Sequence, residues 1–109
     1  MPDPLTDGVI VTTGYLRAPA DQLASIKDEL LEAVHAARAQ PGNIAYSYAI
    51  DLEDPTKLHA CEIWESQDAI AAHTSKPHFD KLIQAWSKVD VLEQAVKLHS
   101  ADRGTLFGA

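Results

Sequence analysis

The sequence predicts an α+β domain in which helices cover one face of a four-stranded antiparallel sheet. Segments rich in β-branched and aromatic residues alternate with segments of helical periodicity in the order β-α-β-β-α-β. The two middle strands are separated only by a short polar turn, which is typical of a hairpin. At 109 residues the chain has the length of a single domain. The order of elements is the split β-α-β arrangement of the ferredoxin-like fold.

A strand and a long helix form the first half of this prediction. Residues 9–17 (VIVTTGYLR) carry apolar or neutral side chains at alternate positions on both faces, as a strand covered on both sides does. Pro19 and Asp21 are typical of a helix start. We expect one helix of about 20 residues that ends at the stop signal QPGN, residues 40–43. Its core-facing residues recur at helical spacing: Leu23, Ile26, Leu30, Val34 and Ala37.

The middle of the chain predicts a hairpin. Residues 44–52 alternate so that Tyr46 and Tyr48 share one face of the strand with Ile44 and Ile50. Residues 51–57 form a polar turn, and residues 58–65 return as the third strand.

An interrupted helix and a last strand complete the prediction. Ser66 is a suitable N-cap for a helix over 67–73, and a second segment begins with Ser75 as N-cap and Pro77 in its first turn. Residues 89–98 are expected to form the fourth strand. A packed stripe is predicted on the second segment from the spacing i, i+3, i+4, i+7, and consists of Phe79, Leu82, Ile83 and Trp86.

The domain boundaries and the uncovered sheet face lead to a further expectation. We expect residues 1–8 to be a flexible arm, residues 9–99 the domain and residues 100–109 a tail. The sheet face opposite the helices is largely apolar at alternate positions. A second copy of the chain would cover this face, so we expect a homodimer that stacks sheet on sheet.

Composition excludes several partners. Sixteen acidic residues against nine basic ones give a formal charge of −7, and the basic residues are not clustered. Nucleic acid and anionic membranes are therefore disfavoured, because phosphate contacts supply most of that affinity. No apolar run approaches the ~20 residues that span a bilayer. With one cysteine, Cys61, and no secretion signal, the expected location is the cytoplasm.

Three short segments form a recognisable set: QPGNIAY (residues 40–46), EIWES (62–66) and AIAAH (69–73), the last followed by Ser75, His78 and Phe79. In this order they resemble the antibiotic biosynthesis monooxygenase superfamily of dimeric α/β-barrel proteins. The resemblance implies oxidation of hydroquinones, naphthols or anthrones by molecular oxygen, with no flavin, heme or metal as cofactor. It also implies that Trp64 and His73 match the family's tryptophan and histidine.

Cofactor-free oxygenation requires an apolar slot, a base and a dry cage. His73 is the predicted base and Trp64 its catalytic partner, with His78 as the second choice of base because a helix N-terminus keeps imidazole neutral. Helix capping is the structural alternative for His73. If Glu62 faced the pocket it would repel an anion or act as a base of raised pKa, but an ion pair or a hydrogen bond at the dimer interface is its more common interpretation. The residues predicted to line the slot also fit ordinary core packing, and are Tyr46, Tyr48, His78, Phe79 and Trp86.

Energetics and alternative functions constrain this hypothesis. Moving a proton from a phenol to an ordinary histidine costs roughly 5 kcal/mol, so hydrogen-bond donors must hold the substrate anion. The main alternative is a non-catalytic dimeric binder of small hydrophobic or aromatic molecules. Heme degradation is disfavoured because residues 12–15 lack the asparagine of heme-degrading relatives. A phosphosugar isomerase would need basic pocket residues, for which only Arg17 and Lys97 are candidates.

Overall fold

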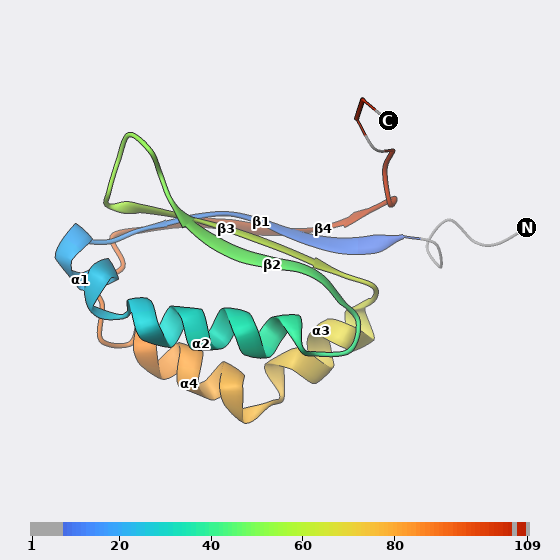
Figure 1. Ribbon diagram of the computed structural model, residues 1–109, viewed down its shortest axis with the longest axis horizontal. Helices are drawn as coiled ribbons and strands as arrows, with labels where there is room; N and C mark the ends of the chain where they lie inside the picture. Colours follow the sequence, from blue (N-terminus) through green and yellow to red (C-terminus); the bar gives the residue numbers. More distant parts are fainter. Residues whose placement is uncertain (1–7, 106, 109) are drawn as a thin grey trace, which may run out of the picture.

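The computed structural model describes residues 8–105, 107 and 108. The four strands form one antiparallel sheet in the order β2-β3-β1-β4. All the helices lie on the same side of this sheet (Figure 1), which confirms the predicted ferredoxin-like α+β fold. Along the chain the elements are β1 (Val9–Arg17), α1 (Ala20–Ser25), α2 (Lys27–Arg38), β2 (Asn43–Ile50), β3 (Lys57–Trp64), α3 (Gln67–Thr74), α4 (Pro77–Trp86) and β4 (Glu93–Ala101).

The sheet register decides which side chains face the helices. Glu62 of β3 lies opposite Thr12 of β1 and opposite Tyr46 of β2. Residues opposite each other share a face, and residues two apart along a strand do so too. Tyr46, Glu62 and Trp64 therefore all project toward the helix layer, and Tyr46 and Trp64 are buried there.

The long first helix is divided, which corrects the prediction of one continuous helix. Ile26 separates α1 from α2 with φ −106° and ψ 14°, and its amide bonds to the carbonyl of Leu23, three residues back. This tightened turn leaves Ile26 only 1% exposed in the core. The whole predicted stripe is buried as expected: Leu23, Ile26, Leu30, Val34 and Ala37.

Side-chain hydrogen bonds explain two other shifted boundaries. β2 ends at Ile50 rather than at residue 52 because Asp51 turns the chain, accepting from the Glu53 amide at 3.0 Å. Ser66 caps α3 as predicted, since its hydroxyl accepts from the Ala69 amide at 3.1 Å. Ser75 does not cap α4: its hydroxyl donates back to the Ala72 carbonyl, and Lys76 is the N-cap.

The second half of the fold corrects two hydrophobic assignments. β4 begins at Glu93, because Val89 closes the last turn of α4 and is buried in the core rather than in the sheet. Ile83 is 52% exposed, so it is not part of the packed stripe on α4. The buried residues of α4 are Leu82 and Ala85.

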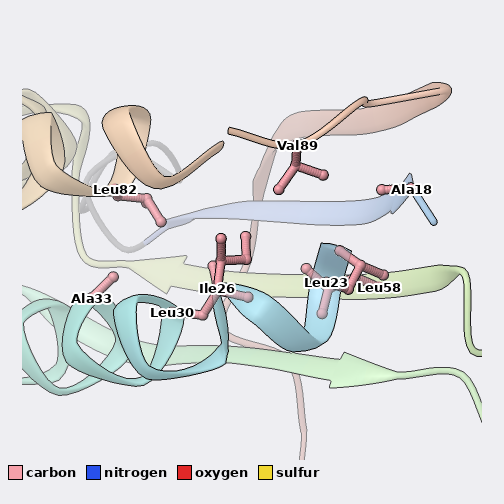
Figure 2. Close-up of a cluster of buried hydrophobic side chains, with 8 residues drawn as sticks. All are labelled: Ala18, Leu23, Ile26, Leu30, Ala33, Leu58, Leu82 and Val89. Carbon is pink, nitrogen blue, oxygen red and sulfur yellow. The ribbon is translucent and has the colours of Figure 1, made fainter. Parts of the chain in front are cut away.

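An aliphatic cluster fills the space between the sheet and the helices at the end of the domain near α1 (Figure 2). The cluster joins α1, α2 and α4 to β3, and every member is buried. It contains no polar side chain and is therefore held by apolar burial alone. Its members are Ala18, Leu23, Ile26, Leu30, Ala33, Leu58, Leu82 and Val89.

The second face of the sheet carries no helix (Figure 1). Alternation places Val11, Tyr15, Cys61 and Ile63 on this open face, where each is half-buried. Within the described part of the chain, no helix has the length and apolar character needed to cross a membrane.

Candidate functional site

An aromatic and histidine cluster lies at the other end of the helix-covered side. It comprises Tyr46 of β2, Trp64 of β3, His73 of α3, and His78 and Phe79 of α4. The His73 ring lies at the centre, 4.7 Å from the Trp64 ring and 5.6 Å from the Tyr46 ring. The fold thus brings together five predicted site residues from four different elements.

His73 is buried at 2% exposed, although its imidazole is ionisable. Burial, reinforced by the neighbouring His78, lowers the pKa of His73 to about 4. Its Nδ1 lies 2.9 Å from Nε2 of His78, so one ring donates to the other. His73 is neutral at pH 7, and its Nε2 is the nitrogen left to meet a ligand.

Trp64 and Glu62 form the second polar contact of the cluster. The indole Nε1–H of Trp64 donates to a carboxylate oxygen of Glu62 at 3.0 Å. Burial raises the pKa of Glu62, and the hydrogen bond from Trp64 opposes part of that shift. Glu62 makes no ion pair with any described residue. The indole N–H of Trp64, one of the donors that could hold a substrate anion, is therefore bound to Glu62 in this structure.

The two predicted tyrosines are coupled to each other. Their hydroxyl oxygens are 3.1 Å apart, and their rings meet edge to face. Burial raises the pKa of Tyr46 far above its usual range and also raises the pKa of Tyr48. Both tyrosines are therefore neutral hydrogen-bonding groups. Tyr48 also packs against the aliphatic cluster, so it bridges the two halves of the core.

Phe79 and Trp86 occupy different places relative to the cluster. The Phe79 ring lies 5.5 Å from that of His73, in an edge-to-face arrangement. Trp86 is half-buried against the aliphatic cluster, and its proximity to Tyr48 lowers the pKa of the Tyr48 hydroxyl, opposing part of the effect of burial. It is therefore a neighbour of Tyr48 and not of His73.

The basic residues considered for a phosphosugar site lie elsewhere. Arg17 forms an ion pair with Asp54 and a hydrogen bond with Thr56 in the β2–β3 turn. Lys97 is exposed and shares the open face with Thr13, its partner in the register. In the described part of the chain, no three His, Cys, Asp or Glu residues are grouped as a metal site requires.

Two cavities border the core. One, of about 260 Å³, lies between α2 and α4 and is lined by His78 together with Glu29, Glu32, Lys81 and Lys88. His78 therefore connects buried His73 to a charged surface pocket. The other, of about 500 Å³, lies between α1–α2 and the β2–β3 hairpin, with Tyr48 in its wall. We call it the α2–β2 groove.

Sequence reasoning identified the members of the cluster better than their contacts. The Glu62–Trp64 pair was detectable, since residues two apart on a strand share a face. The hydrogen bond between His73 and His78 crosses a helix break, and their spacing alone does not specify it. The α2–β2 groove was missed because it forms between segments 20–38 and 48–58, and no local motif marks it.

Comparison with known proteins places the chain in a family. The family model for antibiotic biosynthesis monooxygenases matches residues 9–85. The chain therefore belongs to this family, which confirms the resemblance seen in its sequence. Among curated proteins, none matches the chain significantly.

Solved structures share the fold at low sequence identity. A Deinococcus radiodurans protein that carries the family name is 23% identical with a TM-score of 0.79, covering 93% of this chain and 99% of its own. A Caulobacter crescentus protein of the same name is 17% identical with a TM-score of 0.76, covering 92% and 93%. A conserved protein from Methanosarcina mazei is 16% identical with a TM-score of 0.75, covering 88% and 94%. At these identities the likeness establishes the fold alone.

Proposed function

We propose that the chain is a monooxygenase that oxidises a small electron-rich aromatic compound of the hydroquinone, naphthol or anthrone type with molecular oxygen and no cofactor. Membership of the family supports the class of reaction. One observation carries the proposal: Trp64 joins a carboxyl group of raised pKa, Glu62, to a neutral buried imidazole, His73. Perturbed titratable groups that converge in this way are typical of functional sites.

The structure favours Glu62 over His73 as the proton acceptor. An ordinary histidine is the stronger base of the two, but here the pKa of His73 falls to about 4 while that of Glu62 rises. A phenol of pKa ~10 would transfer its proton to His73 at a cost of about 8 kcal/mol. Burial therefore makes His73 a poor first acceptor and suits it to a neutral hydrogen-bonding role beside the substrate.

A flat substrate fits the helix-facing side of β1 and β4 beside Glu62. The register places Glu62, Thr12 and Leu98 in one row across the sheet, and Ala60, Gly14 and Val96 in the next. Ala60 and Gly14 are small, and Leu98 is 54% exposed although it faces the helix side. An aromatic ring on this surface would cover exposed apolar area while presenting its hydroxyl group to Glu62.

The proposed reaction balances without a cofactor. For an anthrone, Glu62 takes one proton from the acidic CH₂ group, and the carbanion passes one electron to O₂. The substrate radical and superoxide then combine through a new C–O bond, and the resulting peroxide anion takes up the proton from Glu62. Loss of water then breaks the O–O bond and leaves a carbonyl in place of CH₂. The substrate is oxidised, O₂ is reduced, and one oxygen atom enters each product.

The histidine pair provides a route for protons between this site and the surface. His73 lies against Trp64, and His78 lies against His73 and lines the charged pocket between α2 and α4. Protons can thus be exchanged between the site and water through His73 and His78, each neutral imidazole accepting at one nitrogen while it donates from the other. His78 is therefore proposed as a relay residue, with Phe79 and Tyr46 as apolar walls.

Oxygen consumption tests the proposed function. We expect uptake of one O₂ per substrate with at least one member of a panel of menadiol, dihydroxynaphthalenes and anthrone. Glu62→Gln should lower kcat by roughly 10²- to 10⁴-fold, the usual contribution of a general base. Glu65→Gln is the matched control, because Glu65 is exposed and adjacent to Trp64, and its kcat should not change.

The alternative of a non-catalytic aromatic binder has its own signature. Micromolar binding of quinones without oxygen uptake on any panel member would contradict the monooxygenase proposal and support the binder. Equal loss of activity in Glu62→Gln and Glu65→Gln would contradict the role of Glu62 as the acceptor.

We also propose that a second copy of the chain covers the open face. Val11 lies opposite Ile63 there, and both are half-buried, as are Tyr15 and Cys61 on the same face. Light scattering at micromolar concentration should give twice the chain mass of 11.8 kDa. Ile63→Asp should lower that mass, whereas Ile83→Asp, on the exposed side of α4, should not. A monomeric mass for the unmodified protein would contradict the dimer.

A further inference from the structure

The α2–β2 groove is a second binding surface, separate from the histidine cluster. It has a volume of about 500 Å³, within the range of ligand pockets for small molecules. Its lining is mainly aliphatic and includes three buried members of the aliphatic cluster, Leu23, Leu30 and Leu58 (Figure 2). Leu31 and Ile50 form its rim and are 45% and 48% exposed.

The charged side chains of the groove all have the same sign. Lys27 and Arg38 are its only charged lining residues, and His35 is its third polar side chain apart from Tyr48. No acidic residue lines it, although the chain carries a net charge of −7. Within residues 8–105, 107 and 108, neither Lys27 nor Arg38 takes part in an ion pair.

Helix α2 separates its charges by face. Lys27, Leu31, His35 and Arg38 follow one another at intervals of three or four residues and so share the face that lines the groove. The acidic residues Glu29 and Glu32 lie toward α4, where they pair with Lys88 at 3.9 Å and with Lys81 at 3.4 Å. The groove side is thus left with basic groups that the protein itself does not neutralise.

Arg38 is positioned for an anion at one end of the groove. Its Nε donates to the backbone carbonyl of Tyr46 at 2.9 Å, which fixes the guanidinium group at the edge of β2 and leaves its terminal N–H groups for another acceptor. His35 lies one turn before it on α2. From Arg38 the groove runs along α2 to Lys27, a distance of about 16 Å at 1.5 Å per residue.

We propose that the α2–β2 groove binds an amphiphile with an apolar body and an anionic head group, for which a medium-chain carboxylate is the simplest example. The apolar body would lie along Leu31 and Ile50 and cover their exposed surface. The carboxylate would bind Arg38, with His35 as a second donor. This site is independent of the proposed oxygenation, because it needs no redox step and involves none of Glu62, Trp64 or His73.

Titration with decanoate, followed by calorimetry and by amide shifts in NMR spectra of the full chain, tests the proposal. We expect saturable binding below about 1 mM, with shifted amides confined to residues 20–38 and 48–58. Each added methylene from octanoate to decanoate should tighten Kd by up to about fourfold, equivalent to ~0.8 kcal/mol. Decyltrimethylammonium, with the same chain and a cationic head, should bind at least about tenfold more weakly than decanoate.

Variants in the groove separate its polar and apolar contributions. Arg38→Gln should raise the Kd for decanoate about tenfold, because it removes a charge-assisted hydrogen bond. Leu31→Glu should raise it at least as much by placing a carboxylate in the groove. Lys81→Gln is the matched control, since Lys81 is an exposed basic residue that does not line the groove, and its Kd should stay unchanged. If Leu31→Glu fails to fold by circular dichroism, Arg38→Gln decides the result.

Several results would overturn the proposal. Equal affinity for decanoate and decyltrimethylammonium would show that the basic residues do not select the head group. Amide shifts outside the two groove segments would place the ligand elsewhere. Absence of decanoate binding, together with a lower mass for Leu31→Glu in sedimentation velocity, would show that a second copy of the chain covers this groove. Because none of these measurements depends on oxygen consumption, their outcome is independent of whether the monooxygenase proposal is correct.

Discussion

The two ends of the helix-covered side bury side chains of opposite character. At the α1 end, the aliphatic cluster around Ile26 contains no polar side chain. At the α3 end, the aromatic and histidine cluster buries His73 and places Glu62 and two tyrosine hydroxyl groups around it. Burying polar groups is costly unless they are paired. The second cluster therefore depends on the pairing of its polar groups, whereas the first depends on apolar burial alone.

A single strand supplies both clusters. Leu58 and Trp64 lie on the same face of β3, and Leu58 belongs to the aliphatic cluster whereas Trp64 belongs to the other. On this face of β3, the change from aliphatic to polar surroundings occurs between Ala60 and Glu62, because Glu62 directs a carboxyl group toward the helices. No buried side-chain nitrogen or oxygen in the described residues lacks a partner. The buried polar atoms at this end are thus paired within the protein, and a ligand that bound Glu62 or the Trp64 N–H would exchange an existing hydrogen bond for a new one.

The largest expected effect on stability is in the aliphatic cluster. Ile26→Ala removes a side chain that is 1% exposed and should lower the free energy of unfolding by about 2–5 kcal/mol. Urea unfolding measures this change. The site lies in the other cluster, so oxygen uptake at saturating substrate should fall by less than about twofold under conditions in which the variant is folded.

Ile83→Ala provides the matched control for that measurement. Ile83 is 52% exposed on α4, and its truncation should change stability by less than about 1 kcal/mol. If Ile26→Ala proved as mild as Ile83→Ala, the aliphatic cluster would not be the main source of stability. A large loss of activity in folded Ile26→Ala would show that the two clusters are not independent.

Much of the fold could be predicted because local periodicity and tertiary packing agree. Every residue of the predicted stripe from Leu23 to Ala37 is buried, although the helix is divided at Ile26. The predictions for Ile83 and for the start of β4 were wrong for one reason. Apolar residues near a helix end fit several environments, and only the packed structure shows that Val89 is buried while Ile83 faces outward.

The site was predictable as a set of residues but not as an arrangement. The resemblance singled out Trp64 and His73, and the structure stacks their rings. The sequence left a raised pKa of Glu62 open for the case that Glu62 faced the pocket, and it did not indicate the lowered pKa of His73, because both shifts depend on neighbours from other elements. Burial shifts the pKa values of these two groups in opposite directions, and the composition of the chain does not reveal either shift.

A smaller effect, confined to acid pH, distinguishes the polar cluster from the aliphatic one. His73 titrates at about 4 when folded and near 6.5 when unfolded, so the unfolded state binds more protons between these values. Stability contributed by neutral His73 is therefore complete above pH 6.5 and is lost as the pH falls toward 4. The loss amounts to about 3 kcal/mol. Urea midpoints measured from pH 7 to pH 4 should show it.

His73→Leu isolates this contribution, because leucine fills part of the same space and cannot titrate. On acidification the variant should lose about 3 kcal/mol less stability than the unmodified protein. The Ile26→Ala variant should lose as much stability on acidification as the unmodified protein does. Glu62 acts in the opposite direction, since its raised pKa favours the folded state as pH falls, but it is present in both proteins. The Asp54 carboxyl, with a pKa of about 2, titrates below this window. If His73→Leu and the unmodified protein lost stability equally, His73 would not be buried in its neutral form, and the proposed contrast between the two clusters would fail.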